Sequence, residues 1–369
     1  MGDVARYVWC RCKRPLLFFM YERLLDLNTL YNSALKCKKG VDWKQSVQRY
    51  TRDTLLEITA LAEHLADGTY SQLPFYEFDI IERGKPRHIR ALNFRDRVLQ
   101  RVLCDELLLP ALSKYLIYDN SASLKGKGVS FARKRVKVHL EKYHRHHGRE
   151  GFVLMVDLKG FFDSIAHVPL MKMFAAKIKD PALLDLLEKM IRPFGDGRSL
   201  GLGSQVSQVS GIYFPTEIDN YCKIVRGCRY YGRYMDDMYI IHHDKAFLLD
   251  VLEGIKKICR KLELSLNLKK TQVIALRNGF TFLKMRYLYT ETGHIKVIPC
   301  KRTFIRQKRK IRKLLDKAAK GLLLYDDVLQ QYRAWRGNLR KYDAYRSLKK
   351  MDNYFKEAVY GTKRDSEPG

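Results

Sequence analysis

The chain contains the stretch Arg233-Tyr234-Met235-Asp236-Asp237-Met238, with Tyr230-Tyr231 before it and Tyr239-Ile240-Ile241 after it. Tyr and Ile favour strands, and Asp is a common turn residue. The pattern therefore predicts two short strands joined by a tight turn, with Asp236 and Asp237 at its tip. An isolated Asp-Asp pair is usually a surface hairpin turn, so a catalytic interpretation needs support from elsewhere in the chain.

A second carboxylate provides that support, because it stands at the end of another predicted strand. Phe152–Val156 is an unbroken apolar run of strand length, as expected for a strand buried on both faces, and Asp157 follows it. A carboxylate at this place is costly unless a cation neutralises it. If the strand lies beside the Tyr234 hairpin, Asp157 and Asp236 converge. Such oxygen ligands suit Mg²⁺, and two ions about 4 Å apart would activate a primer 3′-hydroxyl and stabilise the leaving pyrophosphate.

Two motifs give the chain a family resemblance. Val156–Asp163 resembles the first catalytic-palm motif of bacterial reverse transcriptases and Tyr234–Asp237 resembles their second, within a likeness that extends from about Tyr70 to Lys301. The resemblance implies an α+β right-hand polymerase with fingers, a palm with an antiparallel sheet and catalytic hairpin, and a helical thumb. It also implies an RNA-directed DNA polymerase, a nucleotidyltransferase that extends a DNA or RNA primer on an RNA template with dNTPs to give cDNA. Two Mg²⁺ ions, for which Mn²⁺ can substitute, would be held by Asp157, Leu158, Asp236 and Asp237.

Other positions match the nucleotide-binding parts of this family. Glu82–Arg87 is predicted to form the turn of a fingers hairpin, and a guanidinium there suits triphosphate oxygens. By resemblance, Arg87 and, less directly, Lys85 contact the incoming nucleotide, and Phe162 excludes its 2′-hydroxyl. The alternatives are a solvated turn and a core phenylalanine. Lys270 lies in a Lys-Thr motif and is either a general acid for pyrophosphate or a surface lysine.

The third active-site motif departs from most of the family. The segment Gly201–Gln208 shows Leu-Gly, three residues, then Ser-Gln, where most bacterial reverse transcriptases have Gln-Gly and Ser-Pro. This departure resembles the reverse transcriptases of diversity-generating retroelements. It implies error-prone copying of template adenines in a template-repeat RNA, assisted by a small basic accessory protein oligomer. The predicted template and fidelity loop consists of Leu202, Gly203, Ser207 and Gln208, with Gln208 also near the nucleotide.

The charge of the chain favours a polyanionic partner. Lys and Arg number 70 against 40 Asp and Glu, a formal net charge of +30 with a pI near 9.8. A glycine-containing segment before a basic helix predicts contacts to the nucleic-acid backbone. Lys301–Lys313 is basic with one apolar face, which fits a thumb helix that follows the primer–template. The residues predicted to contact the backbone are Lys125, Lys127, Arg133, Lys308, Arg309 and Arg312.

Other classes of protein are less consistent with the sequence. No apolar run approaches the roughly 20 residues that span a bilayer, and Leu16–Met20 lacks a cleavage-site pattern. The eight cysteines form no CxxC pair, although Cys10 and Cys12 are close, so neither zinc nor a disulfide framework is indicated. The cluster His144–His147 is interpreted as a solvated helix end. We expect a cytoplasmic protein, encoded by a bacterium or a phage, without membrane association.

Five consecutive segments are predicted from these patterns. They are an N-terminal helical segment (1–70), fingers (71–150), a palm with the catalytic motifs (151–298), a basic helical thumb (299–361) and a disordered tail (362–369). In the first segment, apolar positions within Trp43–Ala66 keep roughly helical spacing. Two alternative functions stay open: an anti-phage defence reverse transcriptase with unusual priming, and a catalytically silent nucleic-acid-binding protein. Intact Asp157, Asp236 and Asp237 argue against the second, because a pure binder has no use for converging carboxylates.

Overall fold

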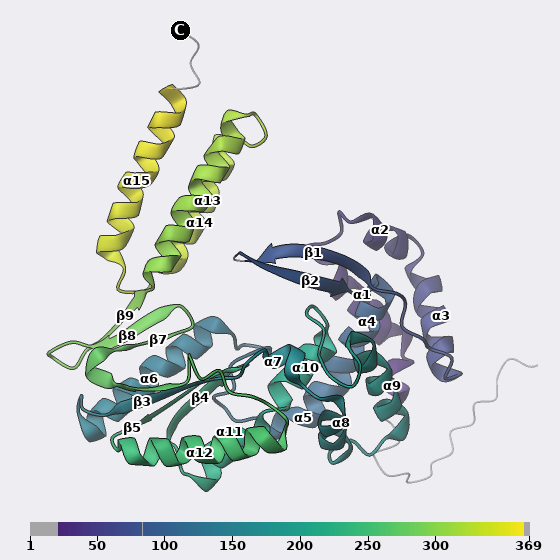
Figure 1. The fold of residues 1–369 in the computed structure, drawn as a ribbon. Helices are drawn as coiled ribbons and strands as arrows, with labels where there is room; N and C mark the ends of the chain where they lie inside the picture. Colours follow the sequence, from purple (N-terminus) through teal and green to yellow (C-terminus); the bar gives the residue numbers. More distant parts are fainter. Residues whose placement is uncertain (1–20, 83, 365–369) are drawn as a thin grey trace, which may run out of the picture. The chain divides into compact units, whose positions relative to one another are not determined.

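The computed structural model describes residues 21–82 and 84–364, which form two compact units (Figure 1). The first unit comprises the residues up to Ser123, Leu158–Tyr221 and Ile255–Leu266, and the second comprises Leu124–Asp157, Cys222–Gly254 and the residues from Asn267 onward. Each unit combines parts of several of the five predicted segments, whose boundaries stay a prediction. The predicted features at Cys10, Cys12 and Leu16–Met20 lie outside the described residues.

The first unit is mainly helical and carries one β-hairpin. Its early elements are η1 (Tyr21–Leu24), α1 (Leu27–Lys38), α2 (Gln45–Arg52), α3 (Thr54–Ala66), β1 (Tyr76–Glu82), β2 (Lys85–Ala91), α4 (Phe94–Val102), η2 (Leu103–Leu108), α5 (Leu109–Leu112) and η3 (Ser113–Tyr115). Its later elements are α7 (Phe161–Ser164), α8 (His167–Ala175), α9 (Pro181–Ile191), η4 (Arg192–Phe194), α10 (Gln205–Tyr213) and α11 (Thr216–Asn220). Strands β1 and β2 pair antiparallel, as predicted for a hairpin.

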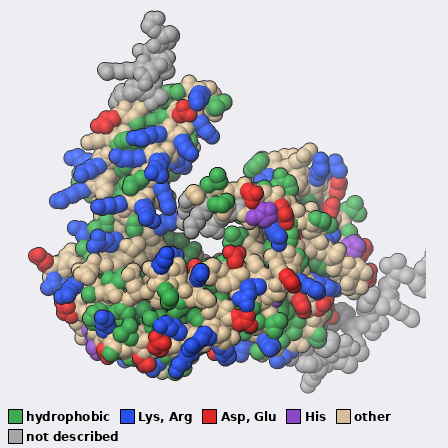
Figure 2. Space-filling model, viewed as in Figure 1, with side chains coloured by type: hydrophobic (Ala, Val, Ile, Leu, Met, Phe, Trp, Pro, Cys, Tyr) green, Lys and Arg blue, Asp and Glu red, His purple; other side chains and the backbone are tan. Residues whose placement is uncertain are grey.

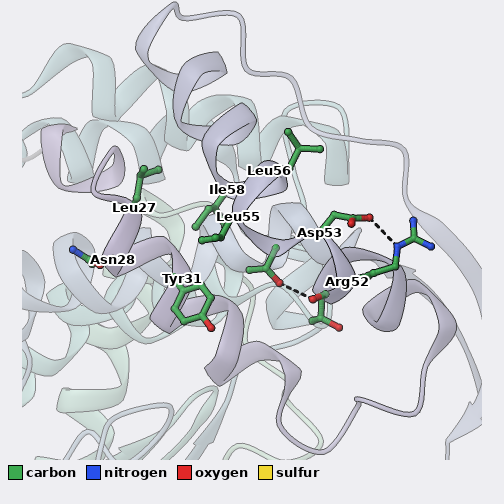
Figure 3. A pocket seen from close by; sticks show the side chains of 10 residues that line it. Leu27, Asn28, Tyr31, Arg52, Asp53, Leu55, Leu56 and Ile58 are labelled. Atoms are coloured by element: carbon green, nitrogen blue, oxygen red, sulfur yellow. Dashed lines mark hydrogen bonds and ion pairs between the residues drawn. The ribbon is translucent and has the colours of Figure 1, made fainter. Parts of the chain in front are cut away.

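The helical spacing of Trp43–Ala66 corresponds to two helices instead of one. Asp53, with φ −115° and ψ 36°, interrupts the helix between α2 and α3. Ile58 of α3 is fully buried, but Leu55 is 69% exposed. After this break, Leu55 lines a groove of about 600 Å³ with Leu27 and Tyr31 of α1 (Figure 3).

The second unit contains the sheet that bears the carboxylates. Its strands are β3 (Phe152–Asp157), β4 (Tyr230–Tyr234), β5 (Asp237–His242) and β6 (Gln272–Ala275), in the antiparallel order β4-β5-β3-β6. Val153, Leu154 and Val156 of β3 are buried, so both faces of the strand are covered, which explains why its apolar run lacks polar alternation. Helix α6 (Val129–His147) packs on this sheet, with Val136, Leu140 and Tyr143 in one core with Val153 and Tyr239.

The same unit continues into a second sheet and a bundle of helices (Figure 1). The elements are η6 (Leu276–Asn278), β7 (Phe280–Phe282), β8 (Met285–Tyr289), β9 (Ile295–Pro299), α13 (Lys301–Ala319), α14 (Tyr325–Leu339) and α15 (Tyr345–Arg364). Ile311 and Leu315 of α13 form a core with Tyr332 of α14 and Phe355 of α15. The apolar side of α13 is therefore buried, which leaves its basic side exposed.

Two further helices, η5 (Tyr221–Val225) and α12 (Lys245–Lys261), contribute residues to both units.

Helix α15 reaches Arg364, three residues into the predicted tail, and residues 365–369 lie outside the described part. Within the described ranges, every helix is too short or too polar to cross a bilayer. The mixture of helices and antiparallel sheets is the predicted α+β class.

Candidate active site

Asp236 and Asp237 lie at a tight hairpin turn that a buried arginine stabilises. Strands β4 and β5 pair from Tyr230 with Ile241 to Tyr234 with Asp237, and Met235 takes a positive φ of 54° in the turn between them. The Arg233 side chain is 1% exposed, and its Nη1 donates to the carbonyl oxygen of Met235 at 3.2 Å. This buried guanidinium therefore stabilises a turn conformation that a non-glycine residue rarely adopts.

Asp157 lies directly opposite this hairpin in the sheet. The β3–β5 register pairs Asp157 with Asp237, so two carboxylates share one end of adjacent strands. Lys270 Nζ lies 2.6 Å from Asp157 Oδ2, and Asn267 Nδ2 donates to Asp157 Oδ1 at 2.8 Å. The main chain of Asn267 also donates to the carbonyl oxygen of Asp157. The loop before β6 therefore holds the buried Asp157 carboxylate with one cationic and one amide donor.

The three carboxylates repel one another in a partly desolvated site. Burial, together with the negative charges of Asp236 and Asp157, raises the pKa of Asp237 to about 7. Burial also raises the pKa of Asp236, and the charge of Asp157 adds to this effect. The hydrogen bond to Asp157 raises the pKa of Lys270, which keeps its ammonium group charged. Such a cluster is stabilised by positive charge.

The donor set fits a hard divalent cation. Aspartate oxygens are the ligands that Mg²⁺ prefers, and the mutual repulsion of Asp157, Asp236 and Asp237 would be relieved by a dication. In the described part of the chain, no group of three or more His, Cys, Asp or Glu side chains has a preformed metal-binding arrangement. Lys270 and Asn267 engage both carboxylate oxygens of Asp157 in this structure.

A cavity of about 430 Å³ opens beside the carboxylates within the second unit. Asp157 and Asp237 line it together with three cationic side chains, Lys269, Lys270 and Arg286. Phe280 and Thr281 of β7 also line it. Anionic and cationic groups thus line a single space, which suits a ligand that carries both metal-bound and free phosphate oxygens.

The first unit brings Phe162 together with the predicted fidelity segment. Phe161 is buried and Phe162 is half-buried, so the ring of Phe161 belongs to the core. A Cβ at Gly211 of α10 would lie 3.3 Å from Cζ of Phe162, so the ring rests against this helix. The main-chain N–H of Leu200 donates to the carbonyl oxygen of Phe162 at 2.8 Å. These contacts give Phe162 a defined position.

The fidelity residues divide into an exposed and a buried group. Gly203 and Gln208 are exposed and Leu202 is half-buried, whereas Ser207 is buried in the helix interface. Gln208 Oε1 accepts from Ser123 Oγ at 3.4 Å. Ser207 therefore faces the protein interior, and the segment presents mainly Leu202, Gly203 and Gln208 at its surface.

The structure explains why glycine occupies positions 201 and 203 of this segment. A Cβ at Gly201 would lie 1.8 Å from the ring of Phe194, so only glycine fits there. Gly203 has a φ of 98°, which disfavours other residues. Close packing at Gly201 therefore holds this part of the backbone in place.

The residues predicted to contact the nucleic-acid backbone differ in their surroundings, because some have contacts within the protein and others are exposed. Arg133 donates through Nε and Nη2 to the carbonyl oxygen of Leu283 and through Nη1 to Tyr342 Oη, so it holds α6 against the β7–β8 turn. Lys125 is exposed, and Lys127 lies over the ring of Phe131. The side chains of Lys85 and Arg87 lie outside the described part, although their main chain belongs to β2.

The exposed side of α13 carries the other predicted cations, where Figure 2 shows Lys and Arg side chains over the helices α13–α15. Lys308 Nζ lies 4.3 Å from the ring centroid of Tyr354, and Arg312 Nε donates to its hydroxyl at 2.8 Å. Arg309 is exposed beside them. Tyr354 of α15 thus orders part of this cationic surface.

Sequence reasoning missed Asn267, Arg233 and Gln100 as residues that support the site. Asn267 lies three residues before Lys270 of the Lys-Thr motif, and this proximity is the one local signal of its role. Arg233 begins the quoted hairpin stretch, yet a strand arginine is normally solvated. Nothing in the local pattern around Gln100 indicates that it would contact a segment 104 residues further on.

Comparisons with known proteins identify a family, a similar curated protein and a solved structure with a similar fold. The family model described as "Reverse transcriptase (RNA-dependent DNA polymerase)" matches residues 78–290. "Protein YkfC" of Escherichia coli (strain K12) is 26% identical over 315 residues, which covers 70% of this chain and 80% of that protein. A structure of telomerase from Candida albicans, in complex with a TWJ fragment of telomeric RNA, matches with a TM-score of 0.50 and 14% identity over 80% of this chain. The match covers 60% of that telomerase chain and shows similarity of fold alone. Together with the family match, it confirms the predicted polymerase fold class.

Proposed function

The chain belongs to the reverse transcriptase family and is an RNA-directed DNA polymerase, and from this premise we propose that it copies a template-repeat RNA into cDNA with errors at template adenines. Membership in the family implies binding of a nucleic-acid template and primer. The observation that carries the proposed chemistry is the register of Asp157 with Asp237, next to Asp236, beside a cavity lined by cations. The Leu-Gly…Ser-Gln segment at Leu202–Gln208 supports the finer assignment to diversity generation.

Reverse transcriptase domains generally use divalent metal ions, and the donor set of this site fits them. We propose that Asp157, Asp236 and Asp237 would hold two Mg²⁺ ions, for which Mn²⁺ can substitute. Leu158 has a buried apolar side chain, so it would contribute only its main-chain carbonyl. When bound, such ions activate the primer 3′-hydroxyl and stabilise the leaving pyrophosphate.

The protein's own residues prepare the site for this chemistry. Arg233 stabilises the turn that carries Asp236, and Asn267 orients the Asp157 carboxylate through Oδ1. Lys270 pairs with Asp157 although its own side chain is 63% exposed. This ion pair supports a charge-neutralising role for Lys270 before substrate binds, and proton donation to pyrophosphate would require the pair to open. Lys269 and Arg286 add positive charge on the cavity wall, where phosphate oxygens would bind.

The proposed accessory protein would meet a strongly basic polymerase. The chain has a formal net charge of +30, so a second basic protein would be repelled by it at long range. Association between the two would therefore need RNA between them, or local acidic and apolar contacts. Salt-dependent binding that disappears after ribonuclease treatment would identify RNA as the bridge.

Error analysis of cDNA tests the proposed function directly. The wild-type protein should copy an RNA template of mixed sequence with more misincorporation opposite A than opposite C, G or U. The measurement is sequencing of the cDNA from a template that contains all four bases in matched neighbouring contexts. Equal error rates at the four bases would reject diversity generation while leaving RNA-directed DNA synthesis intact.

The basic side of α13 leads to a second prediction. Replacing Lys308, Arg309 and Arg312 together with Gln should weaken primer–template binding and reduce its salt dependence. Each lost phosphate contact changes the slope of log K against log salt concentration by roughly 0.7–0.9, so three contacts change it by about 2 to 3. Binding isotherms at several salt concentrations measure the slope.

A matched triple variant controls for total charge. Replacing Lys36, Lys38 and Lys39 with Gln removes the same charge around the end of α1, in the first unit. This control should leave the slope nearly unchanged. If both triple variants shift the slope equally, α13 has no special contact with the nucleic acid.

A further inference from the structure

The helix that begins at α4 contains a buried glutamine that contacts another helix. Gln100 is 1% exposed, and its Oε1 accepts from Ser204 Oγ at 2.9 Å and from the main-chain N–H of Gln205 at 3.1 Å. Ser204 is the N-cap of α10, and its own Oγ accepts from the N–H of Ser207. One amide oxygen therefore binds both the capping residue and the first residue of α10.

A second contact to the same end of α10 comes from the π-helical segment η2. Asp105 Oδ1 accepts from Gln205 Nε2 at 3.1 Å, and Asp105 Oδ2 accepts from Arg101 Nε at 2.6 Å. In a regular α-helix, positions 100 and 105 would lie about 140° apart around the axis. The wider π-helical turn helps Gln100 and Asp105 to contact α10 together.

Helix α10 carries two groups that depend on its position. Gln208 is exposed one turn after the cap, and Gly211 is the surface against which the Phe162 ring rests. A shift or a tilt at the start of α10 would move both. All these residues belong to the first unit, so the contacts form one connected network within it.

Some buried polar atoms where α4 meets α10 lack hydrogen-bond partners. Within the described part of the chain, Gln100 Nε2, Ser207 Oγ and Ser210 Oγ are buried without a hydrogen-bond partner. Unpaired buried polar atoms are unfavourable. The amide at position 100 thus contributes its oxygen while its nitrogen stays unpaired, which points to a requirement for that acceptor.

We propose that Gln100 is a positioning residue for nucleotide selection: it holds the N-terminus of α10, and through it Gln208 and the Phe162 ring, in one place. Asp105 assists through Gln205. This inference rests on the proposed function, because it takes α10 and Phe162 as parts of the site that selects the incoming nucleotide. Neither Gln100 nor Asp105 is assigned any contact with substrate.

The test is Gln100→Met, which keeps the volume of the side chain but removes the acceptor. Misincorporation and the ratio of ribonucleotide to deoxyribonucleotide incorporation should each rise by about tenfold, because the Ser204 hydroxyl and the Gln205 N–H lose their acceptor and α10 shifts. Primer–template affinity should stay within about twofold of wild type, because the change does not affect the basic surface. Gln100→Glu retains an acceptor oxygen at the same place and should restore most of the selectivity.

Amide hydrogen exchange gives a readout that does not require activity. The amides of Gln205–Gln208 should exchange faster in Gln100→Met, while those of the buried strand β3 keep their protection. Leu61→Val, a change in the buried side of α3, controls for general loss of stability and should alter neither selectivity nor exchange in α10. Equal effects of Leu61→Val and Gln100→Met would overturn the proposal.

The remaining outcomes are also decisive. An active Gln100→Met protein with wild-type selectivity would overturn the proposal. If that variant does not fold, Asp105→Ala, at a partly exposed position, takes its place: a smaller rise in both ratios supports the proposal, and unchanged ratios overturn it. Wild-type protein that makes no cDNA on an RNA template would contradict the proposed function itself, which distinguishes the two failures.

Discussion

Asp236→Asn is expected to lower DNA synthesis on an RNA template by about 10³-fold or more, which corresponds to about 4 kcal/mol of transition-state stabilisation. The change keeps the shape of the side chain and removes a negative charge that the proposed ions need. Binding of RNA should stay nearly intact, because the basic surface of α13 is untouched. Primer extension in Mg²⁺ and a separate RNA-binding titration measure the two effects.

The thermal stability of this variant separates catalysis from folding. Burial raises the pKa of Asp236. At pH values above the ordinary pKa of aspartate, the ionised Asp236 carboxylate therefore destabilises the folded protein. A neutral asparagine removes this penalty at neutral pH, and the melting temperature should stay the same or rise. Asp163→Asn is the matched control, because Asp163 belongs to the same palm motif as Asp157 but is exposed. Full extension by Asp236→Asn would refute the proposed metal site.

Phe162→Ala is expected to raise ribonucleotide incorporation, relative to deoxyribonucleotide incorporation, by about 10- to 100-fold. The proposed reason is steric, since the ring would occupy the space of a 2′-hydroxyl. Its contact with Gly211 and the main-chain hydrogen bond from Leu200 limit its freedom to move aside. Single-nucleotide extension with matched pairs of ribo- and deoxyribonucleotides gives the ratio.

The neighbouring ring provides the control for this prediction. Phe161→Leu changes the fully packed phenylalanine of the same pair and should lower stability without altering sugar selection. If the two variants shift the ratio alike, packing and not exclusion explains the result. An unchanged ratio in folded Phe162→Ala would mean that this side chain is only part of the core.

The fidelity segment shows where a local interpretation and the structure diverge. Glycines at positions 201 and 203 suggest a loose backbone when only the sequence is considered. The structure explains Gly201 by close contact with Phe194 and Gly203 by its positive φ. The proposed errors at template adenines would therefore depend on the positions of α10 and Gln208, which contact Gln100 and Ser123, and not on loop flexibility.

The cationic residues show a similar divergence. Sequence composition identifies α13 as basic on one side, and the exposed Lys308, Arg309 and Arg312 agree with that interpretation. Arg133 has the same residue type and also lies on a basic helix, yet it donates to Leu283 and Tyr342 inside the protein. Charge pattern alone does not distinguish these cases, because it contains no information on which segment packs against the helix.

The sequence by itself determined the strands of the site and the aspartates at their ends. The apolar run before Asp157 forms β3, and the aromatic residues around Asp236 and Asp237 form β4, the turn and β5, because strand propensity and turn chemistry act within a few residues. Only the tertiary structure decided that Asn267 and Lys270 engage Asp157 from more than 100 residues away, and that Gln100 holds the start of α10. Those contacts depend on how distant segments pack, and a single Asn, Lys or Gln carries no periodic signal of the partner that it will meet.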